Sequence, residues 1–324
     1  MPRSRAKKLR TPRGKLALPY FIFRVSTMRV GFIGLGAMGL PMAHNLRSAG
    51  FDVVVHNRSR AKVDTFVADG GEAADTPADL ASKVDVVCAC LPIPQVCEEV
   101  FLGPDGVLEN APKGQLWIDF STNGPDTSQR ISSAALSAGC GYLDAPISGG
   151  VWGAEAGTLA IMVGGTAEDF ARASNVFDAV GTNIRHFGES GSGSVVKLVN
   201  NLIGAATNAV IAEGYVAAVK YGIDPASMFE TLQSATAASP GHERMIRDGV
   251  LQRDFEAKFA LNLHAKDQQL AADLGKLVGV RMLVTSAVNE VYKEAQACGY
   301  GNDNTTAIIR PLEDLHNVTV KPSA

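Results

Sequence analysis

The sequence predicts an α/β protein in which a doubly wound sheet domain precedes an all-helical domain. Apolar, strand-like runs alternate with helical stretches over residues 28–190. Such alternation is typical of a largely parallel sheet covered by helices on both faces. A glycine-rich turn joins the first strand-like run to the first helical stretch, and strand signals give way to helical ones over residues 191–320. We therefore place the domain boundary at about residue 190.

Length and composition fit a soluble protein of two domains. The chain has 324 residues, of which 46% are hydrophobic and 19% are charged, and this length is typical of two domains. No apolar run is judged to reach the roughly 18 residues that cross a bilayer, so we expect no membrane partner. The five cysteines form no CxxC pair and indicate buried thiols in a reducing compartment.

Residues 1–27 form a basic leader with eight Lys or Arg and no Asp or Glu. Without them, 22 basic residues face 33 acidic ones, a net charge near −11, which argues against a nucleic-acid partner. An Arg-rich, acid-poor leader is typical of a transit peptide. This one has few serines and no amphipathic stripe, and Met28 directly precedes a strand-like run. We favour an over-long start assignment, and we expect a cytoplasmic protein unless the leader is a genuine transit peptide.

The first strand-like run, 28–34, continues into the turn GLGAMG and then a helical stretch that ends near Gly50, before a second strand at 51–56. This order is the dinucleotide-binding fingerprint of a Rossmann-type domain. The first glycine allows the tight turn, the second lets the backbone approach a pyrophosphate, and the third lets helix and sheet pack closely. The helix N-terminus then attracts the anion. The predicted cofactor residues here are Gly34, Gly36, Ala37, Met38 and Gly39.

The second strand ends in Asn57-Arg58-Ser59. NAD-specific sites usually carry an acid here for the ribose 2′-OH, whereas Asn and Arg suit a 2′-phosphate. We therefore expect NADP(H) as the preferred cofactor, with NAD(H) possible and no metal. The alternative is that Arg58 is a solvated residue that merely stacks on the adenine.

Further strand-like runs end in polar or glycine-rich segments, at 84–92, 115–122 and 139–150, and two more follow at 158–165 and 182–188. Ligands bind doubly wound sheets at the carboxyl ends of the strands. The segments expected to meet in one crevice contain Leu91, Pro92, Ser121, Thr122, Ser148, Gly149 and Gly150.

The second half begins with a long stretch of small and apolar residues, SVVKLVNNLIGAATNAVIAEGYVAAVKYG from Ser194. It is too hydrophobic for an ordinary surface helix, so we expect it to be buried between neighbouring elements or subunits. Lys197, Asn201, Gly204 and Asn208 share one face of this helix. A buried ammonium needs polar partners or a ligand, and burial lowers its pKa toward neutrality. The alternative is a lysine ion-paired across the domain junction.

Four motifs together resemble the β-hydroxyacid dehydrogenase family, which includes 3-hydroxyisobutyrate dehydrogenase and tartronate semialdehyde (2-hydroxy-3-oxopropionate) reductase. The resemblance runs from about residue 28 to about residue 320. The motifs are GFIGLGAMGLPMAHNL at the glycine turn, DAPISGG at 144–150, GSVVKLVNN around Lys197 and LHAKDQQLA at 263–271.

The resemblance implies a role for each matching position. Lys197 matches the catalytic lysine, and Asn201 an asparagine that orients the substrate. Ser148, Gly149 and Gly150 match a loop that binds the substrate carboxylate. Ser121 and Thr122 match the stretch beside substrate and nicotinamide, and Lys266, next to Asp267, matches a lysine that contacts the cofactor. His264 lies two residues from Lys266 and is interpreted as structural.

The implied reaction is hydride transfer between the nicotinamide and a small semialdehyde, with Lys197 as general acid or base. The segment RDFEAKFALNLHAKDQQLA is more like the tartronate semialdehyde reductases, although Ala257-Lys258 replaces the common Pro-Gly and HNRS replaces the common acid. The rivals are an imine reductase and a non-catalytic NADP(H)-binding module. A 6-phosphogluconate-like enzyme would need more basic residues and a longer chain. We expect a homodimer or homotetramer that acts on a small carboxylate.

Overall fold

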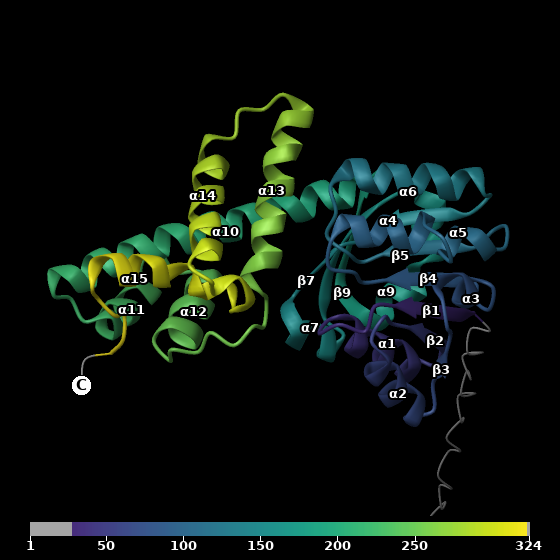
Figure 1. Cartoon of the computed structure of the whole chain (residues 1–324), viewed down its shortest axis with the longest axis horizontal. Coiled ribbons are helices and arrows are strands. Elements are labelled where there is room, and N and C mark those ends of the chain that lie inside the picture. The colour runs from purple at the N-terminus through teal and green to yellow at the C-terminus, as the bar shows by residue number, and fades with distance from the viewer. Residues whose placement is uncertain (1–27, 323–324) are drawn as a thin grey trace, which may run out of the picture.

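The computed structural model describes residues 28–322, so the basic leader at 1–27 lies outside the described residues. The molecule is elongated, and a sheet domain and a helical domain are joined by one long helix (Figure 1). The predicted fold class is confirmed: the first part is a mainly parallel sheet with helices, and the second part is helical.

Six strands form a parallel sheet in the order β3-β2-β1-β4-β5-β6. This is the doubly wound order whose carboxyl edge binds dinucleotides. The strands are β1 (Arg29–Ile33), β2 (Asp52–His56), β3 (Glu72–Ala73), β4 (Val86–Ala89), β5 (Leu116–Asp119) and β6 (Gly141–Asp144).

Three strands extend the sheet beyond β6: β7 (Ile147–Ser148), β8 (Leu159–Gly164) and β9 (Gly181–Gly188). Strand β8 runs antiparallel to β6 and to β7, and β9 runs parallel to β8. The segments predicted at 158–165 and 182–188 are therefore strands, in a part of the sheet that reverses direction.

Helices cover both faces of the sheet, because successive apolar side chains along each strand point to opposite faces and both faces must be buried. In β4, Val86 and Cys88 belong to one apolar cluster, whereas Val87 and Ala89 belong to another on the opposite face. Strands buried on both sides are typical of parallel sheets. The helices of this domain are α1 (Gly39–Ser48), α2 (Arg60–Ala68), α3 (Pro77–Ala81), α4 (Pro94–Leu102), α5 (Val107–Asn110), α6 (Pro125–Ser137), α7 (Gly150–Ala156), α8 (Ala167–Arg172) and α9 (Ser174–Val180).

Helix α10 (Ser192–Tyr221) links the two domains and has 30 residues. It starts against β8 and continues along α13 and α14, and it ends at Gly222 in the left-handed conformation, a common helix stop. A third apolar cluster, which includes Tyr215, Phe229 and Tyr292, fills the helical domain. Its other elements are α11 (Pro225–Gln233), α12 (Pro240–Met245), a π-helical turn (Ile246–Val250), α13 (Leu261–Val278), α14 (Leu283–Ala297), two 3₁₀ turns (Tyr300–Asn302 and Thr305–Ile309) and α15 (Arg310–His316).

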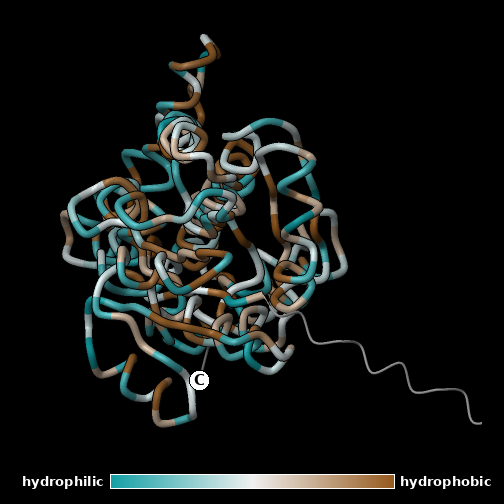
Figure 2. Tube along the Cα trace, turned by 90° about the vertical axis from the view of Figure 1, so that its right-hand side faces the viewer, coloured by the Kyte–Doolittle hydropathy of each residue, from teal (hydrophilic) through white to brown (hydrophobic). Residues whose placement is uncertain are grey.

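Helix α10 corrects one expectation. It is long and apolar enough to cross a membrane by length and composition, although the sequence was judged to contain no such run. One such helix is weak evidence for a membrane span, because core helices of soluble proteins meet the same criteria. Only 28% of its most apolar window is buried within this chain, so burial of the rest between subunits stays a prediction. The protruding tip of the α13–α14 hairpin is also apolar (Figure 2).

Candidate functional site

The glycine turn after β1 has the geometry that the motif predicts. Gly34 has φ +95°, and a Cβ on it would lie 2.4 Å from the carbonyl oxygen of Cys90. A Cβ on Gly39 would lie 1.9 Å from the carbonyl oxygen of Gly34, so α1 starts in contact with the end of β1. A Cβ on Gly36 would meet no atom within 4 Å. Gly34 and Gly39 therefore shape the turn, whereas Gly36 leaves open space above it.

This open space fits a dinucleotide. Gly36 and Ala37 are exposed and Met38 is half-buried. Met38 is the N-cap of α1 and makes no side-chain capping bond, and the first turn of α1 contains no acidic residue. The positive end of the helix dipole therefore faces the opening without an opposing carboxylate, as a pyrophosphate requires.

The segment after β2 has a structural role that the sequence did not predict. The Asn57 Oδ1 atom accepts a hydrogen bond from the Leu35 backbone N–H at 2.9 Å, and its Nδ2 donates to the Ser59 carbonyl at 2.9 Å. Asn57 thus holds the glycine turn in place, and both ends of its amide are already engaged. Arg58 and Ser59 are exposed, and Arg58 makes no ion pair with the residues that the structure describes. Arg58 and Ser59 are therefore the two residues of this segment whose side chains are available to bind a ribose 2′-phosphate.

Ser121 connects the ends of β4 and β5 through hydrogen bonds. Its Oγ accepts from the Leu91 N–H at 2.8 Å, and its own N–H donates to the Asp119 Oδ1 at 2.9 Å. Asp119 also accepts from Asn123 Nδ2 at 2.8 Å. Burial raises the pKa of Asp119 to about 6, against the effect of its hydrogen bonds to Ser121. Pro92 is exposed beside Leu91. Asp119 organises this strand end, and sequence reasoning missed it.

Lys266 connects the two domains at this edge. Its Nζ donates to the Thr122 carbonyl at 2.8 Å and lies 3.0 Å from the Asp267 Oδ1. The Lys266 side chain is 18% exposed and that of Asp267 is 3% exposed. Helix α13 therefore brings a cation and a buried carboxylate to the carboxyl end of β5.

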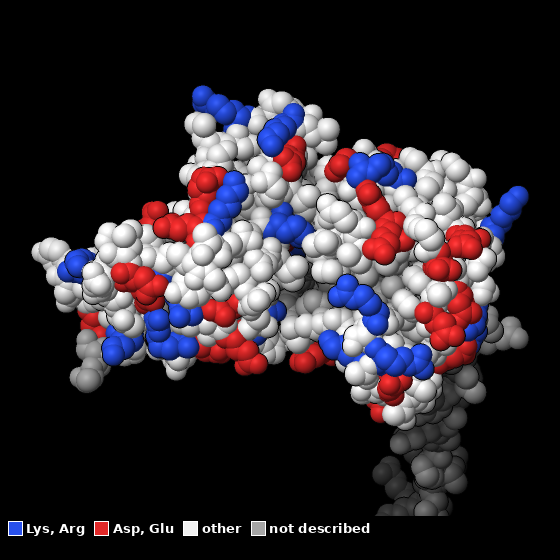
Figure 3. All heavy atoms as spheres, in the orientation of Figure 1, with Lys and Arg blue, Asp and Glu red and all other residues white. Residues whose placement is uncertain are grey.

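The loop Ser148-Gly149-Gly150 leaves the sheet and starts α7. Gly149 has φ +142° and Gly150 has φ +66°, backbone conformations that favour glycine. Ser148 is half-buried and both glycines are exposed. Figure 3 shows a hollow between the domains, with Lys and Arg side chains on both of its sides.

Lys197 lies on the first turns of α10 and is 8% exposed. Among residues 28–322 its ammonium has no hydrogen-bond partner. Burial lowers its pKa to about 8; the nearby Asp267 carboxylate opposes this shift and Lys266 adds to it. A buried ammonium without partners is costly, which makes Lys197 the most unusual cation of the described chain.

Asn201 lies one helical turn after Lys197, and its side-chain Nδ2 donates to the Asp267 Oδ2 at 2.5 Å. Its carbonyl oxygen also accepts from Gln268 Nε2 at 3.2 Å and lies 3.1 Å from His264 Nε2. Asp267 fixes the side chain of Asn201, and α13 thereby holds this turn of α10.

His264 is buried, and burial lowers its pKa. Its Nδ1 lies 2.8 Å from the Thr305 hydroxyl and 2.9 Å from the Tyr292 hydroxyl. The neutral ring therefore joins α13 and α14 to α10 without facing Lys266, as its spacing predicts.

Asp144 is a second buried acid that sequence reasoning did not assign. Its two oxygens accept from the Gly191 and Ser194 backbone N–H groups at 2.7 and 2.8 Å. These are free donors at the start of α10, whose N-cap Gly191 has no side chain to satisfy them. The carboxylate at the end of β6 therefore caps the helix that carries Lys197. The signal was present: like Asp119, it is an acid at the carboxyl end of a buried strand.

The space beside Gly204 on α10 is open. A Cβ on Gly204 would meet no described atom within 4 Å. No close approach within this chain explains the glycine.

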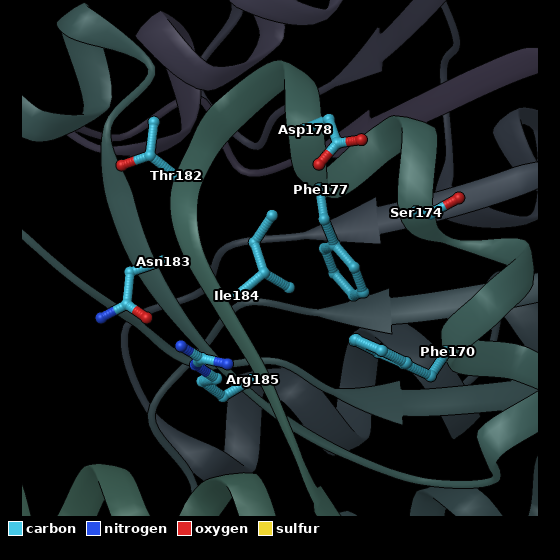
Figure 4. A pocket seen from close by; sticks show the side chains of 8 residues that line it. All are labelled: Phe170, Ser174, Phe177, Asp178, Thr182, Asn183, Ile184 and Arg185. Carbon is cyan, nitrogen blue, oxygen red and sulfur yellow. The ribbon is translucent and has the colours of Figure 1, made fainter.

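A separate hollow of about 350 Å³ lies against α8, α9 and β9, lined by residues that include Phe177, Asp178 and Arg185 (Figure 4). It contains none of the predicted site residues, so cavity size does not locate the chemistry. Over residues 28–322, no group of three or more His, Cys, Asp or Glu could hold a metal ion.

The fold and the glycine turn define a nicotinamide-dependent oxidoreductase, and comparison with known proteins supports this class. Residues 29–188 match the family model "NAD binding domain of 6-phosphogluconate dehydrogenase", and residues 191–312 match "NAD-binding of NADP-dependent 3-hydroxyisobutyrate dehydrogenase". Among individual proteins, 2-(hydroxymethyl)glutarate dehydrogenase of Eubacterium barkeri is 35% identical over 91% of this chain and 98% of its own.

Two further relatives agree. Mitochondrial 3-hydroxyisobutyrate dehydrogenase of Rattus norvegicus is 31% identical over 94% of this chain and 93% of its own. A solved structure of Mycobacterium tuberculosis 3-hydroxyisobutyrate dehydrogenase with L-serine is 30% identical, covers 88% of this chain and 99% of its own, and has a TM-score of 0.81. The chain belongs to the β-hydroxyacid dehydrogenase family and is an NAD(P)-dependent hydroxyacid dehydrogenase.

Proposed function

We propose that the chain uses NADP(H) to interconvert a small β-hydroxy acid and its semialdehyde, with Lys197 as general acid and base. The proposed reaction is most like those of 2-hydroxy-3-oxopropionate reductase and 3-hydroxyisobutyrate dehydrogenase. The observation that carries the proposal is the buried Lys197 ammonium, which has no hydrogen-bond partner among the described residues. It lies one helical turn from Asn201, whose side chain Asp267 fixes.

The cofactor would lie along the carboxyl edge of the sheet. The glycine turn and the start of α1 would hold the pyrophosphate, and Leu91, Pro92 and Thr122 would border the nicotinamide. Lys266 would contact the cofactor from α13, since its ammonium already reaches the Thr122 carbonyl.

The preference for NADP(H) depends on the 2′-position of the ribose. Arg58 and Ser59 are exposed after β2, and this strand end contains no acid to bind a 2′-hydroxyl. A guanidinium without an ion-pair partner suits the 2′-phosphate.

The protein residues would supply substrate binding and the proton. When bound, the cofactor supplies the hydride that the carbonyl carbon accepts. The Ser148-Gly149-Gly150 loop would hold the substrate carboxylate, and Ser121 and Asn201 would orient the carbonyl. Lys197 Nζ would donate a proton to the oxygen as the carbon–oxygen double bond becomes a single bond, and in the reverse direction it would accept the hydroxyl proton. A pKa of about 8 leaves both forms of Lys197 accessible near neutral pH.

The test is to measure oxidation of NADPH and NADH separately with tartronate semialdehyde, methylmalonate semialdehyde, succinic semialdehyde and glyoxylate. We expect turnover of at least one substrate, faster with NADPH. Lys197→Met should lower kcat by roughly 10²–10⁴-fold and leave NADPH binding nearly unchanged. Lys220→Met, on the last turn of the same helix, is the matched control. A Lys197→Met enzyme that kept more than about a tenth of the rate would contradict the assignment, since general acid catalysis is worth far more.

The same assay separates the alternatives. Tight NADPH binding without turnover of any aldehyde would favour an imine reductase or a non-catalytic NADP(H)-binding module, and reduction of a cyclic imine would distinguish these two.

We propose a cytoplasmic location. The relatives include both a rat protein named as mitochondrial and a bacterial protein. The test is to compare fluorescent fusions with and without residues 1–27; import that requires this segment would overturn the proposal.

A further inference from the structure

An exposed tryptophan of the sheet domain and a lysine of the helical domain are in contact. Trp152 lies on α7, two residues after Gly150, and it is 58% exposed. The Lys258 ammonium, from the segment before α13, lies 5.6 Å from the centroid of the indole ring. An ammonium over an indole face is a favourable contact.

The two residues come from opposite domains, and each is close in sequence or in space to a predicted substrate-binding residue. Trp152 follows the Ser148-Gly149-Gly150 loop directly. Lys258 precedes Phe259, whose ring lies 5.0 Å from that of His264. His264 in turn contacts the carbonyl oxygen of Asn201. The pair therefore joins the segment that follows the Ser148 loop to the segment that packs, through His264, against Asn201.

Lys258 is available to an incoming anion. Its ammonium lies 3.0 Å from the Asp254 Oδ2, and the two side chains are 42% and 39% exposed. Ion pairs this exposed contribute little and exchange readily. The Asp254 Oδ1 is bound to the Glu256 N–H at 3.0 Å, so Asp254 stays anchored when its other oxygen is displaced.

We propose that Trp152 and Lys258 form a second anion subsite, which binds the distal carboxylate of a dicarboxylic hydroxy acid or semialdehyde. This rests on the proposed function, in which the loop at Ser148 holds the first carboxylate. One ammonium beside Asp254 suits a single negative charge better than a phosphate, which carries nearly two.

The test uses two substrates that share the reacting hydroxymethyl group. 3-Hydroxyisobutyrate has one carboxylate and 2-(hydroxymethyl)glutarate has two, and 2-(hydroxymethyl)pentanoate matches the longer chain without the second charge. We expect kcat/KM to be highest for the dicarboxylate. Lys258→Gln should raise its KM about tenfold, the order expected for one charge-assisted hydrogen bond, with kcat and both monocarboxylate KM values unchanged.

Two further variants make the test specific. Trp152→Ala should also raise the KM of the dicarboxylate, because the Lys258 ammonium loses its contact with the indole ring. Lys293→Gln removes an exposed, ion-paired lysine on α14 and should change nothing. Equal KM changes for all substrates with Lys258→Gln, or no wild-type preference for the dicarboxylate, would overturn the subsite while the proposed function stands. Oxidation of none of the three would overturn the subsite alone if a semialdehyde of the first panel is turned over, and would overturn the proposed function as well if none is.

Discussion

The pKa of Lys197 predicts how the reaction rate changes with pH, and the change has opposite directions for reduction and oxidation. Reduction requires the protonated amine, so its rate should fall as pH rises through about 8. Oxidation requires the neutral amine, so its rate should rise over the same range. The measurement is kcat/KM against pH in both directions. A reduction limb centred near 6 would instead indicate Asp119, whose pKa is raised to about 6.

The same pKa also affects folding. The folded state releases the Lys197 proton near pH 8, below the ordinary value of 10.5. Between these values the unfolded chain binds more protons, so this residue makes the free energy of unfolding rise with pH there. The cost of the buried charge is therefore present below pH 8 and is relieved above it. Such a cost is reasonable for a residue whose ammonium acts on a bound ligand.

At the scale of single elements, the start of α10 depends on Asp144. We expect Asp144→Asn to lower the free energy of unfolding by about 1–3 kcal/mol, because the new NH₂ group faces a backbone N–H and leaves it unsatisfied. Urea denaturation checks this. Asp126→Asn, which changes an exposed acid on α6, should stay within about 0.5 kcal/mol of the wild type. A loss from Asp144→Asn as small as that of the control would show that the cap contributes nothing.

The glycine turn allows a second prediction at this scale, because its glycines have different surroundings. Gly39→Ala places a methyl group 1.9 Å from the Gly34 carbonyl oxygen and should destabilise the cofactor-free protein by about 1–3 kcal/mol through overpacking. Gly36→Ala meets no atom within 4 Å, so it should leave Tm unchanged and weaken NADPH binding.

Thermal unfolding and NADPH titration together check this contrast. Gly204→Ala is the control, since it also meets no described atom and should stabilise α10 by up to about 1 kcal/mol. If Gly36→Ala bound NADPH like the wild type, the assignment of the open space to the pyrophosphate would be wrong.

At the scale of the whole molecule, local patterns predicted the fold class but not every strand direction. The Gly-x-Gly-x-x-Gly turn and the buried alternating runs indicate a doubly wound sheet from neighbouring residues alone. The antiparallel pairing of β8 with β6 depends on contacts between distant segments and leaves no local signal. The hydrogen bonds of Asn57 and Asp144 could not be predicted either, because their partners lie 22 and 47–50 residues away; for Asp144 the sequence showed only an acid at a strand end.

The surface of α10 leads to the last prediction. Val199, Ile203 and Val210 lie on one face of the helix and are 44%, 62% and 67% exposed. Exposed apolar stripes of this kind are typical of protein interfaces, and the apolar tip of the α13–α14 hairpin adds to the area (Figure 2). A second copy of the chain would cover this face and complete the burial that the helix composition predicts. We therefore expect a dimer or tetramer in sedimentation equilibrium.

A charge on this face should shift the equilibrium toward monomers. Val210→Glu buries an unpaired carboxylate in any interface that includes α10, which costs several kcal/mol. Val67→Glu, at an exposed valine on α2, is the matched control and should leave the assembly intact. A wild-type chain that sediments as a monomer would contradict the predicted assembly, and binding to lipid vesicles would then be the next measurement, because α10 is also long and apolar enough to enter a bilayer.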